Sequence, residues 1–182
     1  MTQAQTISES GDMPTSPESL MAYLKDLGID FTLHHHKAFF TVAEGEAIER
    51  DIEGTHCRNL FLRDKKKNNF LVVLQNATAV DIKKLQPLIG ADKLSFGSAE
   101  RLWEYLGVRP GSVCPYAIIN DKAGEVKIIL DKSMMETARV NYHPLLNTMT
   151  IGTTPADLLR FIESTGHTPH IVDLSAAAPD KE

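Results

Sequence analysis

The part of this sequence best suited to chemistry is a short loop rather than a set of catalytic side chains. Gly111 and Pro115 bracket Ser112, Val113 and Cys114. Glycine allows a ligand to approach the backbone closely, and proline fixes φ and removes one donor. The loop therefore has few conformations to lose on binding, and we expect its main-chain N–H groups to face a ligand.

A single histidine, His143, is the side chain most suited to assist such a loop. It ends a short apolar run and is followed by Pro144, which restricts its backbone. A neutral imidazole can act as a general base, or it can accept a hydrogen bond as part of a pocket wall. A lone histidine before proline is ordinarily a surface or capping residue, so the sequence leaves these roles open.

Two other kinds of site need consideration. Cys57 lies beside Arg58, and Cys114 lies inside the loop, where a basic neighbour could lower a thiol pKa and create a nucleophile. No histidine spacing supports such a nucleophile, and small buried thiols are common. The run His34–His36 does not predict a metal site, because adjacent side chains of a strand point to opposite faces. Motifs of serine hydrolases, zinc proteases and Cys-x-x-Cys proteins are lacking, so we expect neither metal nor cofactor.

Composition predicts one ordinary globular domain. The chain has 182 residues, of which 42% are hydrophobic and 24% charged, close to the average for packed domains. No apolar run approaches the roughly 18 residues of a membrane span. Residues 1–5 show neither a basic nor an apolar signal region, and two cysteines are too few for a disulfide framework. We therefore expect a cytoplasmic protein.

A net charge of −5 argues against a protein that coats nucleic acid, although local charge matters more than the total. Residues 58–67 contain five basic side chains and one acid. The basic residues are Arg58, Arg63, Lys65, Lys66 and Lys67. The pattern of residues 63–67 is compatible with either a solvated hairpin turn or a patch that contacts phosphate.

Capping residues predict the helices that must carry these candidates. Ser16 with Pro17, the capping box that starts at Thr41, Ser98, and Thr154 with Pro155 each mark a helix start. Gly28, Gly107 and Gly166 mark helix ends. The expected helices cover residues 16–27, 41–50, 81–89, 98–107 and 154–166.

Apolar patterning predicts the strands. They are expected at residues 30–35, 57–63, 70–75, 116–120, 126–131, 138–142, 148–151 and 170–173. Residues 70–74 are apolar throughout, as in a strand covered on both faces. Residues 116–120 and 126–131 are expected to form a hairpin.

These elements indicate the fold class. Strands and helices are intermixed without a strict β-α-β rhythm, so we expect one α+β domain over residues 16–174, with a mixed, mostly antiparallel sheet and helices packed around it. Residues 1–15 are polar and lack periodicity, which predicts a disordered lead. Residues 175–182 are expected to be a loose tail.

Several motifs in order along the chain resemble a known family. They are residues 54–64 (GTHCRNLFLRD), 94–96 (LSF), 100–102 (ERL), 106–108 (LGV), the loop 110–116 (PGSVCPY), 140–147 (VNYHPLLN) and 166–169 (GHTP). Together they cover most of residues 16–174. The chain resembles the YbaK-type prolyl-tRNA editing superfamily, also found as an insertion domain of bacterial prolyl-tRNA synthetases. Among its subfamilies, the freestanding alanyl-tRNA(Pro) deacylases are the most similar.

The resemblance implies a deacylase that hydrolyses the ester between an amino acid and the terminal ribose of tRNA. It implies no metal and no covalent nucleophile, with the substrate's vicinal hydroxyl assisting. The catalytic residues that it implies are His143, Gly111 and Asn59. The substrate-binding residues that it implies are Arg58, Ser112, Val113, Cys114, Pro115 and Tyr116. Relatives usually carry Lys where this chain has Arg58, and a planar fork presents its donors differently from an ammonium.

The resemblance also implies partners. Aminoacylated tRNA(Pro) is the expected substrate, with contacts from Arg63, Lys65, Lys66, Lys67 and His36. Prolyl-tRNA synthetase is a second candidate partner, no membrane contact is expected, and a monomer is the default. The expected activity is removal of alanine mischarged onto tRNA(Pro). Alternatives are a deacylase for cysteinyl-tRNA(Pro) or another small mischarged residue, and a non-catalytic module that binds tRNA or the synthetase.

Overall fold

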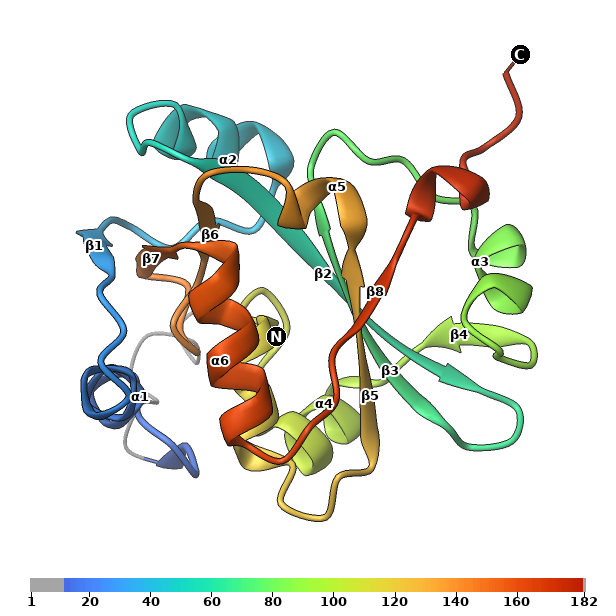
Figure 1. Ribbon diagram of the computed structural model, residues 1–182, viewed down its shortest axis with the longest axis horizontal. Helices are drawn as coiled ribbons and strands as arrows, with labels where there is room; N and C mark the ends of the chain where they lie inside the picture. The colour runs from blue at the N-terminus through green and yellow to red at the C-terminus, as the bar shows by residue number, and fades with distance from the viewer. Residues whose placement is uncertain (1–11, 182) are drawn as a thin grey trace.

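The computed structural model describes residues 12–181, and Figure 1 shows the arrangement of its elements. The helices are α1 (Pro17–Asp26), α2 (Val42–Glu49), α3 (Ile82–Leu88), α4 (Ala99–Leu106), α5 (Lys132–Met135) and α6 (Pro155–Ser164), with 3₁₀ helices η3 (Pro115–Asn120) and η4 (Leu174–Ala177). The strands are β1 (Thr32–His35), β2 (Thr55–Asp64), β3 (Asn69–Gln75), β4 (Leu94–Phe96), β5 (Val126–Asp131), β6 (Val140–Tyr142), β7 (Met149–Thr153) and β8 (His170–Val172).

The strands of the described residues form one mixed sheet in the order β1-β7-β6-β2-β3-β5-β8, with β4 paired to β2. Four of the seven pairings in this sheet are antiparallel, and β2–β6, β3–β5 and β5–β8 are parallel. The predicted α+β class with a mixed sheet is therefore confirmed.

The strand β3 separates two hydrophobic cores. Leu71 and Val73 point into the larger core with α1, α4, η3 and α6, whereas Phe70, Val72 and Leu74 point into the smaller core with α3 and η4. Figure 1 shows α3 and η4 on one side of the sheet and α1 and α6 on the other. The alternation confirms that β3 is covered on both faces, as its continuous apolar run predicted.

Local chemistry sets the helix starts as predicted. The side chains of Ser16, Thr41, Ser98 and Thr154 each accept a hydrogen bond from the backbone N–H three residues later. None of the helices in residues 12–181 is long and apolar enough to cross a membrane.

The predicted strand at residues 116–120 is wrong. The segment Pro115–Asn120 is a 3₁₀ helix, and its first five residues are buried. Pro115 supplies a pre-formed φ at the first helical position and lacks the N–H that would be left without a partner there. The strand β5 pairs with β3 and β8 instead.

Order extends further at both ends than the sequence predicted. Residues 1–11 of the expected disordered lead lie outside the described residues, but Asp12 forms an ion pair with Arg109, and Thr15 donates a hydrogen bond to Asn120. At the other end, Ala177 is fully buried, and its carbonyl oxygen accepts a hydrogen bond from the N–H of Asp81. Residues 12–15 and the start of the predicted loose tail are therefore packed on the domain.

Candidate functional site

The first half of β2 lies where the sheet divides. β6 pairs with Thr55 and His56, whereas β4 pairs along the same strand with Leu62–Asp64. Between these pairings, β6 ends at Tyr142 and its chain turns away through residues 143–147. This division leaves room for loops beside the middle of β2.

A pocket of about 360 Å³ opens beside this part of β2. Its lining residues come from α2 and the segment before it, the first half of β2, the residue after β3 and the loop at residue 111. They are Phe39, Phe40, Thr41, Gly45, Glu46, Glu49, Cys57, Arg58, Asn76 and Gly111. A larger cavity of about 670 Å³ lies between α3 and β4, but none of its lining residues was predicted to be functional.

The two motifs singled out in the sequence lie against each other beside this pocket, which Gly111 lines and residues 143–147 do not. Gly111 has φ +90°, and a Cβ added there would lie 3.4 Å from Nδ2 of Asn147. The backbone of Leu145 also lies close to the Cys114 thiol, whose pKa it acts to lower. Leu145 itself is buried with φ +73°, a left-handed conformation that costs a non-glycine residue about 1–2 kcal/mol. The turn after His143 is thus held in a strained shape against the loop at Gly111.

The hydrogen bond of His143 determines which of its ring nitrogens carries the proton. Its Nδ1 lies 2.8 Å from the carbonyl oxygen of Met149, so Nδ1–H donates and Nε2 is left as an acceptor. Burial lowers the pKa of His143 to about 4, and the Met149 hydrogen bond only partly opposes this effect. The ring also packs against Phe39, with centroids 5.3 Å apart, and against His36 at 5.9 Å. At neutral pH the site therefore contains a neutral imidazole.

We expect this half-buried imidazole to make stability depend on pH. The pKa of His143 is lowered on folding, so the unfolded chain binds its proton first as pH falls. Stability from this residue is complete above about pH 6.5 and decreases toward pH 4, by up to about 3 kcal/mol. Urea unfolding of the parent and of His143→Gln at pH 7 and pH 4.5 measures the effect. The loss on acidification should be smaller in the variant by about 2–3 kcal/mol, and equal losses would contradict the burial argument.

Arg58 and Asn59 lie in β2 with different surroundings. The Arg58 guanidinium donates to the carbonyl oxygens of Asn76, at 3.1 Å, and Thr78, at 2.6 Å. It lines the pocket and at the same time anchors the chain that follows β3. Asn59 Oδ1 is buried without a hydrogen-bond partner in the described part of the chain, and Asn59 is not part of the pocket lining. A buried acceptor of this kind is where a ligand or water is expected.

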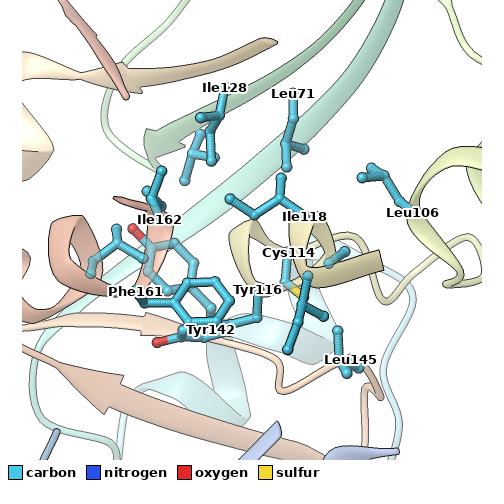
Figure 2. Close-up of a cluster of buried hydrophobic side chains, with 14 of the residues drawn as sticks. Leu71, Leu106, Cys114, Tyr116, Ile118, Ile128, Tyr142, Leu145, Phe161 and Ile162 are labelled. Carbon is cyan, nitrogen blue, oxygen red and sulfur yellow. The ribbon is translucent and has the colours of Figure 1, made fainter. Parts of the chain in front are cut away.

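The side chains that follow Gly111 are placed differently from the expectation. Cys114, Pro115 and Tyr116 are buried, and Figure 2 shows Cys114 and Tyr116 among the side chains of the larger core. The prediction that Tyr116 lines the pocket wall is therefore wrong, because its ring packs against Phe161 and Tyr142. Any contact of these residues with a ligand must come from the backbone.

The alternative of a thiolate nucleophile is disfavoured. Burial raises the pKa of both Cys57 and Cys114 to about 12. Both thiols are therefore protonated at neutral pH, although Cys57 lines the pocket. The basic neighbour Arg58 does not reverse this effect, since its donors point to backbone carbonyls.

The remaining predicted residues lie in two places. Lys65, Lys66 and Lys67 are exposed at the turn between β2 and β3, whereas Arg63 donates to Asn69 and lies over the Tyr105 ring. His36 instead belongs to the pocket region. Its Nδ1 contacts the carbonyl oxygen of Lys37, and its Nε2 contacts the hydroxyl of Thr150, each at 2.8 Å.

Several residues of the pocket were not predicted from the sequence. Phe39 and Phe40 form its aromatic side, and Glu46 and Glu49 of α2 line it with carboxylates. Burial raises the pKa of Glu49, and the nearby Glu46 adds to this shift. The capping box at Thr41 predicted a helix start but no pocket; in the structure it begins the helix that carries Glu46 and Glu49, and Phe39 and Phe40 directly precede it.

Comparisons with known proteins agree in family and fold. A family model described as an aminoacyl-tRNA editing domain matches residues 36–161. The prolyl-tRNA editing protein ProX of Acetoanaerobium sticklandii is 35% identical over 158 residues, which cover 86% of this chain and 96% of the relative. Prolyl-tRNA synthetase associated domain-containing protein 1 of Danio rerio is 36% identical over 174 residues, which cover 92% and 95%. A solved structure of a candidate trans-editing enzyme for prolyl tRNA synthetase matches with a TM-score of 0.66 at 18% identity, covering 92% of this chain and 99% of that one.

Proposed function

Because this chain belongs to the aminoacyl-tRNA editing domain family, we propose that it is a freestanding deacylase that removes alanine mischarged onto tRNA(Pro). The substrate class follows the name of the relative ProX, which is called a prolyl-tRNA editing protein. The observation that carries the proposal is the contact of the Gly111 loop with Asn147, beside a pocket that is lined by Gly111 and by Phe39, on which His143 packs.

The chemistry required is modest. An aminoacyl ester is already activated, so the enzyme needs to position a water molecule and stabilise negative charge on the carbonyl oxygen. The N–H of Ser112 already donates to the carbonyl oxygen of Arg109, at 3.0 Å. The amides of Gly111 and Val113 are therefore our candidates for binding the substrate carbonyl oxygen.

Acceptor side chains of β2 and of the turn after β6 are candidates for the other parts of the substrate, with Asn59 outside the pocket lining itself. Nε2 of His143 is an acceptor in the neutral ring, and Oδ1 of Asn59 is a second buried acceptor. Water, the vicinal hydroxyl of the ribose and the ammonium of the amino acid are donors that such groups can bind. Glu46 and Glu49 place negatively charged carboxylates in the lining of the same pocket. Their charge favours an aminoacyl group with a cationic ammonium.

Selectivity for alanine has a physical basis. The aminoacylation site of a synthetase that binds proline cannot strongly reject alanine. Each methylene that alanine lacks changes the binding free energy by only about 1–3 kcal/mol. A second, hydrolytic site that excludes proline by size supplies the missing fidelity. Phe39 and Phe40, along one side of the pocket, are the candidates for this steric exclusion.

The exposed lysines at the turn between β2 and β3 are the candidate tRNA-backbone contact. Arg58 and Asp64 are six positions apart in β2, which corresponds to about 20 Å along the strand. A single-stranded 3′ end that enters the pocket could therefore leave the adjoining phosphates near Lys65, Lys66 and Lys67. Prolyl-tRNA synthetase is a further candidate partner, supported only by the names of relatives.

We expect replacement of Lys65, Lys66 and Lys67 by alanine to raise KM for aminoacyl-tRNA and to weaken its salt dependence. Each lost contact with a single strand reduces the slope of log KM against log salt concentration by about 0.7, so the total change is about 2. Replacement of Lys25, Lys122 and Lys132 is the matched control, because these exposed lysines come from three separate places. Equal slopes in the two triple variants would show that the turn is only a solvated hairpin.

Hydrolysis of tRNA(Pro) charged separately with alanine, cysteine, serine and proline tests the proposed function. We expect rapid loss of the alanyl ester and no loss of the prolyl ester. Rapid loss of the cysteinyl or seryl ester instead would retain the reaction and correct its specificity. Binding of tRNA without turnover of any ester would favour the non-catalytic module, a role compatible with the anchoring of Arg58 on Asn76 and Thr78.

A further inference from the structure

Two consecutive aromatic residues form one side of the pocket. The ring of Phe39 packs between His36 and His143, with centroid distances of 5.5 and 5.3 Å. A Cβ added at Gly45 would lie 2.8 Å from this ring, so the absence of a side chain there lets Phe39 fit beneath α2. Phe39 is therefore a fixed inner wall.

Phe40, in contrast, lies at the solvent-facing edge of the pocket. Its side chain is 50% exposed, and a Cβ on Gly111 would lie 3.1 Å from two of its ring atoms. Its N–H donates to Oε2 of Glu44 at 3.1 Å, and it directly precedes the helix cap Thr41. The ring thus lies over Gly111 while one part of it faces solvent.

Exposure of a single phenylalanine is common and needs no explanation by itself. The position of Phe40 is more informative, because its ring borders both the pocket and the loop proposed to bind the ester carbonyl. A ligand that enters the pocket must pass this ring.

We propose that Phe40 is a stacking platform for the nucleobase of the nucleoside that carries the ester. The inference rests on the proposed function. The amino acid, the ribose and the base are joined in sequence, so an aminoacyl group inside the pocket leaves the base at the mouth. Proteins commonly hold unpaired bases on aromatic rings, and such stacking tolerates any base because each has a π-face.

This role makes Phe40 a positioning residue that acts on binding. Loss of one base–aromatic stack weakens binding by roughly tenfold. The change should appear in KM more than in kcat at saturating substrate. Tyrosine, which keeps the ring, should retain binding, whereas leucine, which keeps apolar bulk without a π-face, should not.

The test uses a stable probe, adenosine whose 3′ oxygen is replaced by an amide-linked alanine, and the same alanylamino ribose without a base. We expect calorimetry to show that the parent and Phe40→Tyr bind the nucleoside roughly tenfold more tightly than the sugar alone. Phe40→Leu should lose this preference. Phe96→Leu is the control, because Phe96 is 67% exposed on β4, outside the pocket lining.

Each outcome decides the proposal. A parent protein that binds both probes equally, or a Phe40→Leu variant that keeps the base preference, would overturn it. Deacylation by the parent is measured in the same series, so the two proposals can fail separately. If the parent hydrolyses no aminoacyl-tRNA but shows a Phe40-dependent base preference, the enzymatic proposal fails and the stacking platform stands.

Discussion

Replacement of Gly111 by alanine is expected to lower kcat/KM for aminoacyl-tRNA hydrolysis by about a hundredfold in a protein that remains folded. The added Cβ would lie 3.1 Å from the Phe40 ring and 3.4 Å from Nδ2 of Asn147. The contact with Phe40 is too close by a few tenths of an ångström, so the ring or the loop would have to shift, whereas 3.4 Å from Asn147 is an ordinary contact distance. Misplacement of a bound reactant by about 1 Å can cost a hundredfold in rate.

The variant also carries a backbone penalty. Gly111 has φ +90°, where alanine costs about 1–2 kcal/mol. Gly166 offers a matched control, because its φ is +85° and a Cβ there meets nothing within 4 Å. Gly166→Ala should lose similar stability in urea unfolding and keep its deacylase activity. Full activity in Gly111→Ala, measured on the same alanyl-tRNA, would remove the loop from the site.

Features of the fold that depend on neighbours close in the sequence could be predicted. Ser16, Ser98 and Thr154 were identifiable as caps because their hydroxyl groups bond to N–H groups only three residues away. The apolar run of β3 likewise predicted a strand buried on both faces. Such features depend on near neighbours, which the sequence supplies directly.

Features that depend on distant neighbours were missed. The segment Pro115–Asn120 is short and apolar, and such a run reads equally as a strand or as a buried helix. Its place beneath α4 and α6 decides the matter. The strand β4 is only three residues long and exists because β2 offers it an edge.

The same difference between near and distant neighbours applies to the residues of the candidate site. The sequence pointed to Gly111 and His143, but it did not reveal that Asn147 bridges toward Phe39, where its Nδ2 lies 3.5 Å from the carbonyl oxygen. It also could not show that Tyr116 faces the core, since period-2 patterning was applied to a segment that is helical. Side-chain direction follows the type of element, so one wrong element changes the predicted lining.

We expect His143→Ala to reduce kcat/KM by about a hundredfold, and His143→Gln to remain within about tenfold of the parent. The imidazole donates to Met149 through Nδ1 and offers Nε2 as an acceptor. A pKa of about 4 makes it a weak base at neutral pH, so its main role is to accept a hydrogen bond. Glutamine can place an amide oxygen near the same position, and loss of a hydrogen bond to a charged group costs about 1.5–3 kcal/mol.

The pH dependence separates this role from general-base catalysis. The parent should lose activity as pH falls through about 4, when the proton that binds His143 removes its acceptor. His143→Gln cannot titrate and should lack this acid limb, with folding at each pH checked by tryptophan fluorescence. A proton-accepting role instead requires that glutamine be as inactive as alanine, because an amide cannot take the proton of the attacking water. That result, together with an acid limb near pH 6 to 7 in the parent, would assign His143 as the base and contradict its burial in neutral form.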